Sequence, residues 1–177
     1  MLITISGLPG SGTTTVSRLV AAALDLERVP GGEVFRLMAQ EAGMSLADFG
    51  AYVQDHPELD RQLDDRLLSH AAAGGCVVES RLAGWLATRH GLTAVRVWIR
   101  GDDQVRAERV AERDGTTVAR AAADNAARSD LERARYRAVY GLDLDDLSVY
   151  DLVLDSSDTP AEVLAATVVD AARATFG

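Results

Sequence analysis

The stretch SGLPGSGTTT, residues 6–15, decides the fold because it joins a strand-like segment to a helix-like segment through three glycines. It follows an apolar, β-branched run at 2–6 and opens a segment, 13–24, whose apolar residues recur at helical spacing. In such a turn consecutive backbone N–H groups converge on phosphate oxygens, and the following helix adds positive potential at its N-terminal end. The stretch therefore predicts a phosphate-binding loop.

The loop departs at one position from the phosphate-loop pattern G-x-x-x-x-G-K-[ST], because Thr13 stands where the pattern has lysine. Thr14 occupies the position whose hydroxyl meets Mg²⁺. We favour phosphate binding over a functionless glycine-rich turn, because the loop lies at the first strand–helix junction. The residues predicted to hold the phosphates are Gly7, Leu8, Pro9, Gly10, Ser11, Gly12, Thr13, Thr14 and Thr15.

The rest of the chain predicts an α/β fold in one domain, residues 1–177. Strand-like runs lie at 2–6, 76–80, 94–100 and 150–157. Helical patterns separate them, including a pair that Ser45 caps and that His56-Pro57 breaks. Strands that alternate with helices indicate a parallel sheet covered by helices on both faces.

Composition narrows the class of partner. The net charge is −9, and all 18 basic residues are arginines, since the chain has no lysine. An acidic chain disfavours non-specific binding to nucleic acid. No apolar stretch approaches the roughly 20 residues of a membrane span, and the single cysteine, Cys76, lies in an apolar run as a buried thiol would. We therefore expect a cytoplasmic protein with no nucleic-acid or membrane partner.

Half of the arginines, nine, lie within residues 100–140. Helical spacing places them in two groups, Arg106, Arg109 and Arg113 on one face, and Arg128 and Arg135 with Glu132 between them on another. Guanidinium forks match phosphate oxygens, so the groups resemble a clamp for an oligophosphate. Spacing alone equally fits solvated helices with surface ion pairs. The phosphate loop tips the interpretation towards the clamp.

Three further residues are candidates for binding. Glu79 ends a predicted strand, at the carboxyl edge where open α/β sheets bind ligands. We predict that it holds Mg²⁺ through water, the alternative being an ordinary acid at a strand end. Arg81 would point into the same crevice. Arg36 is a candidate for binding a second phosphate ligand on the opposite side, the alternative being an ordinary surface arginine.

Successive blocks of the sequence resemble the archaeal-type cytidylate kinases, a branch of the nucleoside monophosphate kinases. The blocks, in order, are ITISGLPGSGTTT, GGEVFR, MSLADF, ESRLAGW, VRAERVAERDG and RYRAVYGLDLDDLSVYDLVLDSS. They cover residues 2 to about 157, and in that family threonine commonly replaces the lysine of the loop. One departure is Ser80, which stands where the family usually has glycine and is expected to crowd the acceptor.

The resemblance implies a P-loop kinase core with a helical insert at about 31–70 for the monophosphate and a short lid at about 110–137. The reaction would be the transfer of the γ-phosphoryl group of ATP, with Mg²⁺, to CMP or dCMP. Nothing in the sequence demands an oligomer, so we expect a monomer. Thr14 and Glu79 would bind the metal ion. The other implied residues are Arg36 and Arg81 for the acceptor phosphate, Asp64 and its neighbour Asp60 for the pyrimidine, and Arg109, Arg113, Arg128 and Arg135 for closure over the transferred group.

Two other functions remain open on the sequence. One is a kinase of the same architecture that acts on another nucleoside monophosphate or on a small metabolite such as shikimate. The other is a regulatory nucleotide-binding module that lost catalysis together with the lysine. The arginine groups favour an enzyme, because a decayed enzyme has no reason to retain them.

Overall fold

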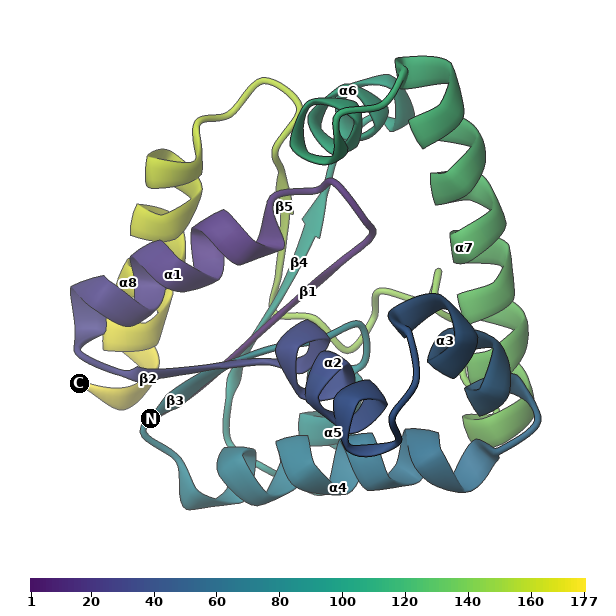
Figure 1. Ribbon diagram of the computed structural model, residues 1–177. Helices are drawn as coiled ribbons and strands as arrows, with labels where there is room; N and C mark the ends of the chain where they lie inside the picture. Colours follow the sequence, from purple (N-terminus) through teal and green to yellow (C-terminus); the bar gives the residue numbers. More distant parts are fainter.

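The computed structural model describes residues 1–177, apart from the side chains of residues 46, 47 and 54. Its centre is a sheet with the strand order β2-β3-β1-β4-β5, in which every neighbouring pair is parallel (Figure 1). The strands are β1 (Leu2–Gly7), β2 (Glu27–Pro30), β3 (Cys76–Glu79), β4 (Val95–Arg100) and β5 (Leu152–Asp155). The helices are α1 (Thr13–Leu24), α2 (Gly31–Glu41), α3 (Leu46–Gln54), α4 (Pro57–Ala73), α5 (Ala83–Arg89), α6 (Asp103–Asp114), α7 (Val118–Tyr140) and α8 (Ala161–Phe176).

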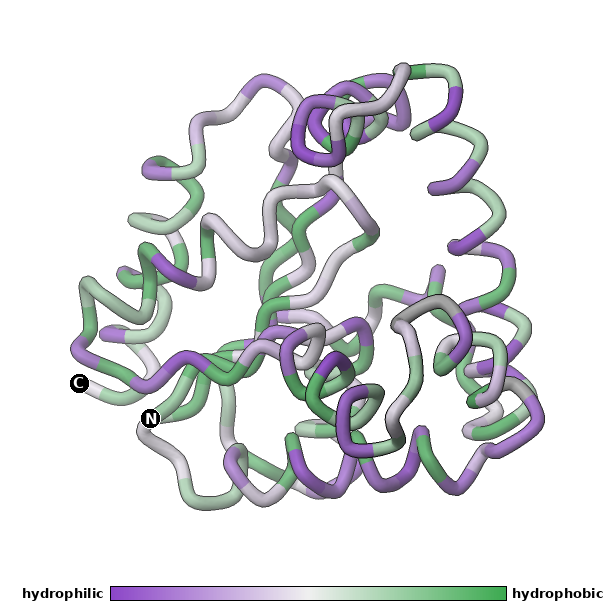
Figure 2. The backbone as a smooth tube through the Cα atoms, viewed as in Figure 1, coloured by the Kyte–Doolittle hydropathy of each residue, from purple (hydrophilic) through white to green (hydrophobic). Residues whose placement is uncertain are grey.

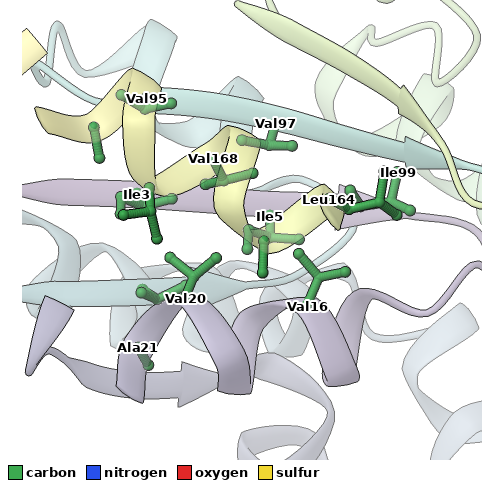
Figure 3. Close-up of a cluster of buried hydrophobic side chains, with 14 residues drawn as sticks. Ile3, Ile5, Val16, Val20, Ala21, Val95, Val97, Ile99, Leu164 and Val168 are labelled. Atoms are coloured by element: carbon green, nitrogen blue, oxygen red, sulfur yellow. The ribbon is translucent and has the colours of Figure 1, made fainter. Parts of the chain in front are cut away.

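Helices cover both faces of the sheet, because alternate residues of its central strand point to opposite sides. Ile3 and Ile5 of β1 pack between α1 and α8 in the larger core, where Figure 3 shows Val20 and Val168 beside them. A second core, with Leu67 of α4, lies on the other face. Figure 2 shows hydrophobic residues along the central strands and a mixture of hydrophilic and hydrophobic residues along the helices. The prediction of a parallel α/β sheet covered on both faces is confirmed.

Strand β2 is an element that the sequence did not predict. It has only four residues, it pairs with β3 at the edge of the sheet, and it contains Arg28 and Pro30. Proline is accepted there because an edge strand leaves one side without a hydrogen-bonded neighbour. A short, partly exposed strand has little of the apolar pattern by which strands are recognised, so only the pairing with β3 reveals it.

Two local predictions, the cap at Ser45 and the helix break at His56-Pro57, are confirmed. The hydroxyl of Ser45 caps α3 by accepting from the backbone N–H of Asp48 at 3.1 Å, and α4 begins at Pro57. Gly115 ends α6 in the left-handed conformation, with φ of 64°. No helix in the described part of the chain is long and apolar enough to cross a membrane.

Helix α7 connects two distant regions of the molecule. It starts beside α6, and its far end lies near α4 in Figure 1, where the structure records an ion pair between the two helices. Its inward stripe is largely polar and consists of Ala121, Asn125, Ser129, Glu132 and Tyr136. Helix α7 is therefore positioned to link the 31–73 helices to the segment that follows β4.

Candidate active site

The loop between β1 and α1 has the backbone shape of a phosphate cradle. Gly10 and Gly12 adopt φ of 83° and 86°, a region that side chains rarely enter, and α1 begins directly afterwards at Thr13. A Cβ at Gly10 would collide with the carbonyl oxygen of Arg106, and one at Gly7 with that of Ile99. The glycines are therefore required both for the turn and for its close packing against the neighbouring segments.

Parallel pairing of β1 with β3 brings Glu79 to this loop, where three hydroxyl groups surround its carboxylate. Oε1 accepts from Thr14 Oγ1 at 2.6 Å and from Thr13 Oγ1 at 3.1 Å. Oε2 accepts from Ser17 Oγ at 2.9 Å. The structure thus places the two residues predicted to serve the metal, Thr14 and Glu79, in direct contact.

These two residues fit Mg²⁺. A hydroxyl and a carboxylate are the hard oxygen donors that this cation takes. Within the described residues no group of three His, Cys, Asp or Glu side chains converges on a metal position. A cation between Thr14 and Glu79 would therefore take its remaining oxygens from water and phosphate, as Mg²⁺ does at nucleotide sites.

Arg28 is a residue of this site that sequence reasoning missed. Its Nη1 donates to Glu79 Oε2 at 2.9 Å, and its Nη2 donates to Glu33 of α2 at 2.8 Å. The side chain of Arg28 is 22% exposed and that of Glu79 is 14% exposed, so the pair is partly shielded from water. Arg28 belongs to no sequence motif. Only the pairing of β2 with β3 brings it beside the loop, so no signal in the sequence indicated it.

The three arginines expected on one face of α6 lie in three different environments. Arg106 is buried and supports the loop by donating to the carbonyl oxygen of Pro9 at 3.0 Å. Arg109 donates to Ser156 Oγ at 2.9 Å and to the Ser156 carbonyl at 2.6 Å. Arg113 is exposed and pairs with its neighbour Asp114 at 2.7 Å.

Arg109 also lines a pocket beside the loop. The pocket lies between the loop, the start of α1 and the segment that leads into α8. Its lining residues are Ser11, Gly12, Thr15, Val16, Arg109, Ser156, Thr159, Ala161 and Leu164. A planar guanidinium group on the wall of a pocket is suited to stacking against an aromatic ring.

A second group of charged residues, which we term the acceptor-side network, lies between α4 and α7. Its members are Asp60, Asp64, Arg81, Arg128, Glu132, Arg135 and Tyr140. Glu132 accepts from Arg81 and Arg128, and Arg135 pairs with Asp60 at 3.1 Å without the alignment of a hydrogen bond. Tyr140 donates its hydroxyl to Asp64. Residues far apart in the sequence thus form one polar cluster.

Burial sets the charge states in this network. Burial raises the pKa of Asp64 to about 6, although the hydrogen bond from Tyr140 opposes the shift. Burial also raises the pKa of Asp60, against the attraction of Arg135. Burial likewise acts to raise the pKa of Glu132, but Arg81 and Arg128 outweigh it and leave that pKa below its usual value. Glu132 therefore stays charged at neutral pH, whereas Asp64 titrates at a pH only slightly below neutral.

Two other expectations concern the acceptor. Arg36 lies exposed on α2, and its guanidinium makes no ion pair with any other side chain that the structure describes, so it is not part of the network. The Oγ atom of Ser80 accepts a hydrogen bond from the backbone N–H of Leu82 at 3.2 Å and so supports the turn before α5. The hydroxyl of Ser80 is thereby engaged within its own turn.

Comparisons with known proteins agree on one family. The model of the cytidylate kinase-like family matches residues 2–158. A cytidylate kinase of Pyrococcus horikoshii is 44% identical over 168 residues, which cover 95% of this chain and 86% of the relative. That of Methanocaldococcus jannaschii is 40% identical over 163 residues, or 92% of each chain.

Solved structures show the same fold at low sequence identity. A shikimate kinase from Acinetobacter baumannii, crystallised with shikimate, superposes with a TM-score of 0.62 at 14% identity, over 99% of this chain and 94% of its own. An uncharacterized protein from Eubacterium ventriosum reaches a TM-score of 0.71 at 14% identity, over 97% of both chains. At such identities the likeness concerns the fold alone.

Proposed function

This chain belongs to the cytidylate kinase-like family, and on that premise we propose that it transfers the γ-phosphoryl group of ATP to CMP or dCMP. The products are ADP and CDP or dCDP. The observation that supports the proposal is that one chain contains two separate groups of residues suited to phosphate. One is the backbone cradle with Thr14 and Glu79, and the other is the acceptor-side network with its arginines.

We propose that the loop, residues 7–15, binds the phosphates of ATP through its backbone N–H groups. Thr14 would bind Mg²⁺ directly and Glu79 would bind it through water. When bound, the ion neutralises charge on the β- and γ-phosphate oxygens. The pocket beside Arg109 fits the adenine ring, because the guanidinium plane stacks on aromatic faces. In this proposal Arg109 holds the base of ATP, while Arg113, Arg128 and Arg135 remain the arginines for closure.

On the acceptor side we propose that Arg81 and Arg36 bind the phosphate of CMP. Asp64, with Asp60 beside it, would accept a hydrogen bond from the exocyclic amino group of cytosine, as carboxylates do at cytosine N4. Uracil carries a carbonyl oxygen at that position, and two acceptors facing each other repel. The network therefore favours CMP and dCMP over UMP.

The chemistry requires positioning and charge more than proton transfer. The acceptor is already an anionic phosphate, so no general base has to remove a proton from it. The γ-phosphoryl group transfers when attacking and leaving oxygens are aligned and the equatorial oxygens are neutralised. Arginines supply that charge in place of the lysine absent from the loop, and their planar forks also fix the direction of the phosphate.

A coupled assay with Mg-ATP and a panel of CMP, dCMP, UMP and AMP tests the proposal. We expect turnover with CMP and dCMP and much less with UMP and AMP. Turnover of AMP without CMP would overturn the base assignment, and binding of ATP without turnover of any acceptor would favour a regulatory module. We also propose that one copy suffices, because both phosphate sites lie within one chain, and light scattering of the active protein tests this.

A further inference from the structure

Glu132 is an enclosed carboxylate between two arginines from different parts of the chain. Its side chain is 8% exposed. Oε2 accepts from Nε of Arg81, in the segment between β3 and α5, at 2.9 Å. Oε1 accepts from Nε of Arg128, one turn earlier on α7, at 2.8 Å. One carboxylate thus fixes two guanidinium groups relative to each other.

The way in which Glu132 holds these arginines leaves their binding ends available. Both donate through Nε, and within the part of the chain that the structure describes their terminal Nη groups have no hydrogen-bond partner. None of the Nη atoms of Arg81 is among the buried atoms that lack a partner, so these atoms reach solvent. The edge formed by the two Nη groups can bind a phosphate in a bidentate manner.

We infer that Glu132 is a positioning residue, which holds Arg81 and Arg128 by their Nε atoms so that their Nη groups face the phosphates of the substrates. The inference rests on the proposed function. Arg81 follows Glu79 by two residues, so its backbone lies close to the residue whose carboxylate contacts the phosphate loop. Glu132 thereby ties the acceptor arginine to α7, the helix that makes up most of the expected lid.

A carboxylate is needed for this role. It accepts from two cationic donors at once, one on each oxygen, whereas an amide offers one oxygen and repels a donor at its nitrogen. The charge also keeps both guanidinium groups from turning away to other acids, of which this acidic chain has many. Glutamine at this position would keep the shape of the side chain and lose both properties.

The first test substitutes Glu132→Gln and measures binding of CMP and of Mg-ATP by calorimetry. We expect the dissociation constant of CMP to rise about tenfold or more, because Arg81 loses its orientation, and that of Mg-ATP to change less than about twofold. Asp130→Asn is the matched control, since Asp130 is an exposed acid on the same helix that pairs with Arg133 at 3.3 Å. It should leave both constants unchanged.

A double-mutant cycle separates positioning from general support of the fold. Arg81→Ala, Glu132→Gln and the double variant are compared for CMP affinity and for thermal unfolding. If Glu132 acts through Arg81, the second substitution adds less than about a twofold loss of CMP affinity once Arg81 is absent. Losses that multiply would show independent roles and overturn the inference.

A third variant keeps the inference testable if Glu132→Gln does not fold. Glu132→Asp retains the charge but is one methylene shorter, and should weaken CMP binding in the same pattern by a smaller factor. Unchanged CMP affinity in a folded Glu132 variant overturns the inference while leaving the kinase proposal intact. Failure of the unmodified protein to phosphorylate CMP overturns the proposed function instead, so the two outcomes are distinct.

Discussion

Glu79 beside the phosphate loop and Glu132 on α7 are both carboxylates with little exposed surface, yet their hydrogen-bond donors differ in charge. Glu79 accepts from three hydroxyl groups and one guanidinium, that of Arg28. Glu132 accepts from two guanidinium groups, those of Arg81 and Arg128. Neutral hydroxyl donors are exchanged for water or a cation at modest cost, whereas a buried charge that loses its partner is strongly destabilising.

The difference separates an adaptable carboxylate from a fixed one. In the proposed function Glu79 changes hydrogen-bond partners when a nucleotide and its cation bind. Glu132 is placed to keep its partners and to hold their outer atoms in one arrangement. We expect substitutions around Glu79 to alter cation-dependent chemistry and substitutions around Glu132 to alter the geometry of acceptor binding, and the following experiments sharpen or break that division.

The largest effect is expected from Thr14→Ala. In the proposed function the hydroxyl of Thr14 binds Mg²⁺, and its removal should lower kcat by about 100-fold or more, because the ion would lose a fixed ligand beside the transferred phosphate. Ser17→Ala is the matched control, since Ser17 donates to the same carboxylate from inside α1 and should cost less than about tenfold. A coupled assay over a range of Mg²⁺ concentrations measures both. Loss of ATP affinity with unchanged kcat would contradict the prediction.

Arg128→Lys tests the fixed side of the comparison. Lysine keeps the charge but lacks both the Nε that contacts Glu132 and the planar fork, so we expect kcat to fall about 10- to 100-fold. Arg133→Lys, on the exposed side of the same helix where it pairs with Asp145 at 3.0 Å, should retain normal turnover. Equal turnover in the two variants would show that charge alone suffices at position 128.

Asp64→Asn should stabilise the protein near neutral pH. Because burial raises the pKa of Asp64 from 3.8 to about 6, the folded state binds more protons than the unfolded state between these values. The contribution of Asp64 to the free energy of unfolding therefore decreases as the pH rises through this range, and stays reduced above it. Removing the ionisable group should add about 2 kcal/mol at neutral pH.

Denaturant unfolding of the Asp64→Asn variant at several pH values measures this gain, which should vanish towards pH 4. Asp65→Asn is the control, because Asp65 is the exposed neighbour on the same helix and should change stability little. The variant should also bind CMP more weakly, as is common where a site retains a destabilising group for function. Lower stability at neutral pH would contradict the assignment.

The smallest effect concerns Arg28. Arg28→Met removes the one charged donor of Glu79 and should lower the free energy of unfolding, measured in the absence of cations, by about 1 kcal/mol. Glu33→Gln breaks only the exposed arm of the same arginine and should have less effect. Adding Thr13→Lys to Arg28→Met should restore the loss, because a lysine at the loop supplies the same charge to Glu79. Absence of that rescue would show that Arg28 does not stabilise the protein through the charge that it supplies to Glu79.

The sequence allowed the shape of the loop to be predicted because its geometry is mostly local. Positive φ at Gly10 and Gly12, and the helix that follows, are properties of a short segment. Glu79 needed one more assumption, that its strand lies beside the first strand in a parallel sheet. That assumption holds, since Ile5 is paired with Glu79 across the two strands.

Other parts of the site could not be predicted by spacing. Periodicity places Arg106, Arg109 and Arg113 on one helix face, but the elements packed against α6 give them three separate roles. Glu132 was visible on the same face as Arg128, yet nothing in the sequence indicated that Arg81 would reach it. The short strand with Arg28 gave no apolar pattern at all.

The sequence by itself determined the phosphate loop, the alternation of strands and helices and the abundance of arginine, because these depend on residue type and on spacings of a few positions. Only the tertiary structure decided which acid each arginine meets. Asp60 and Asp64 on α4, Arg81 after β3 and Glu132 on α7 are separated by up to tens of residues, and side chains so far apart become partners only when packing fixes the helices that carry them.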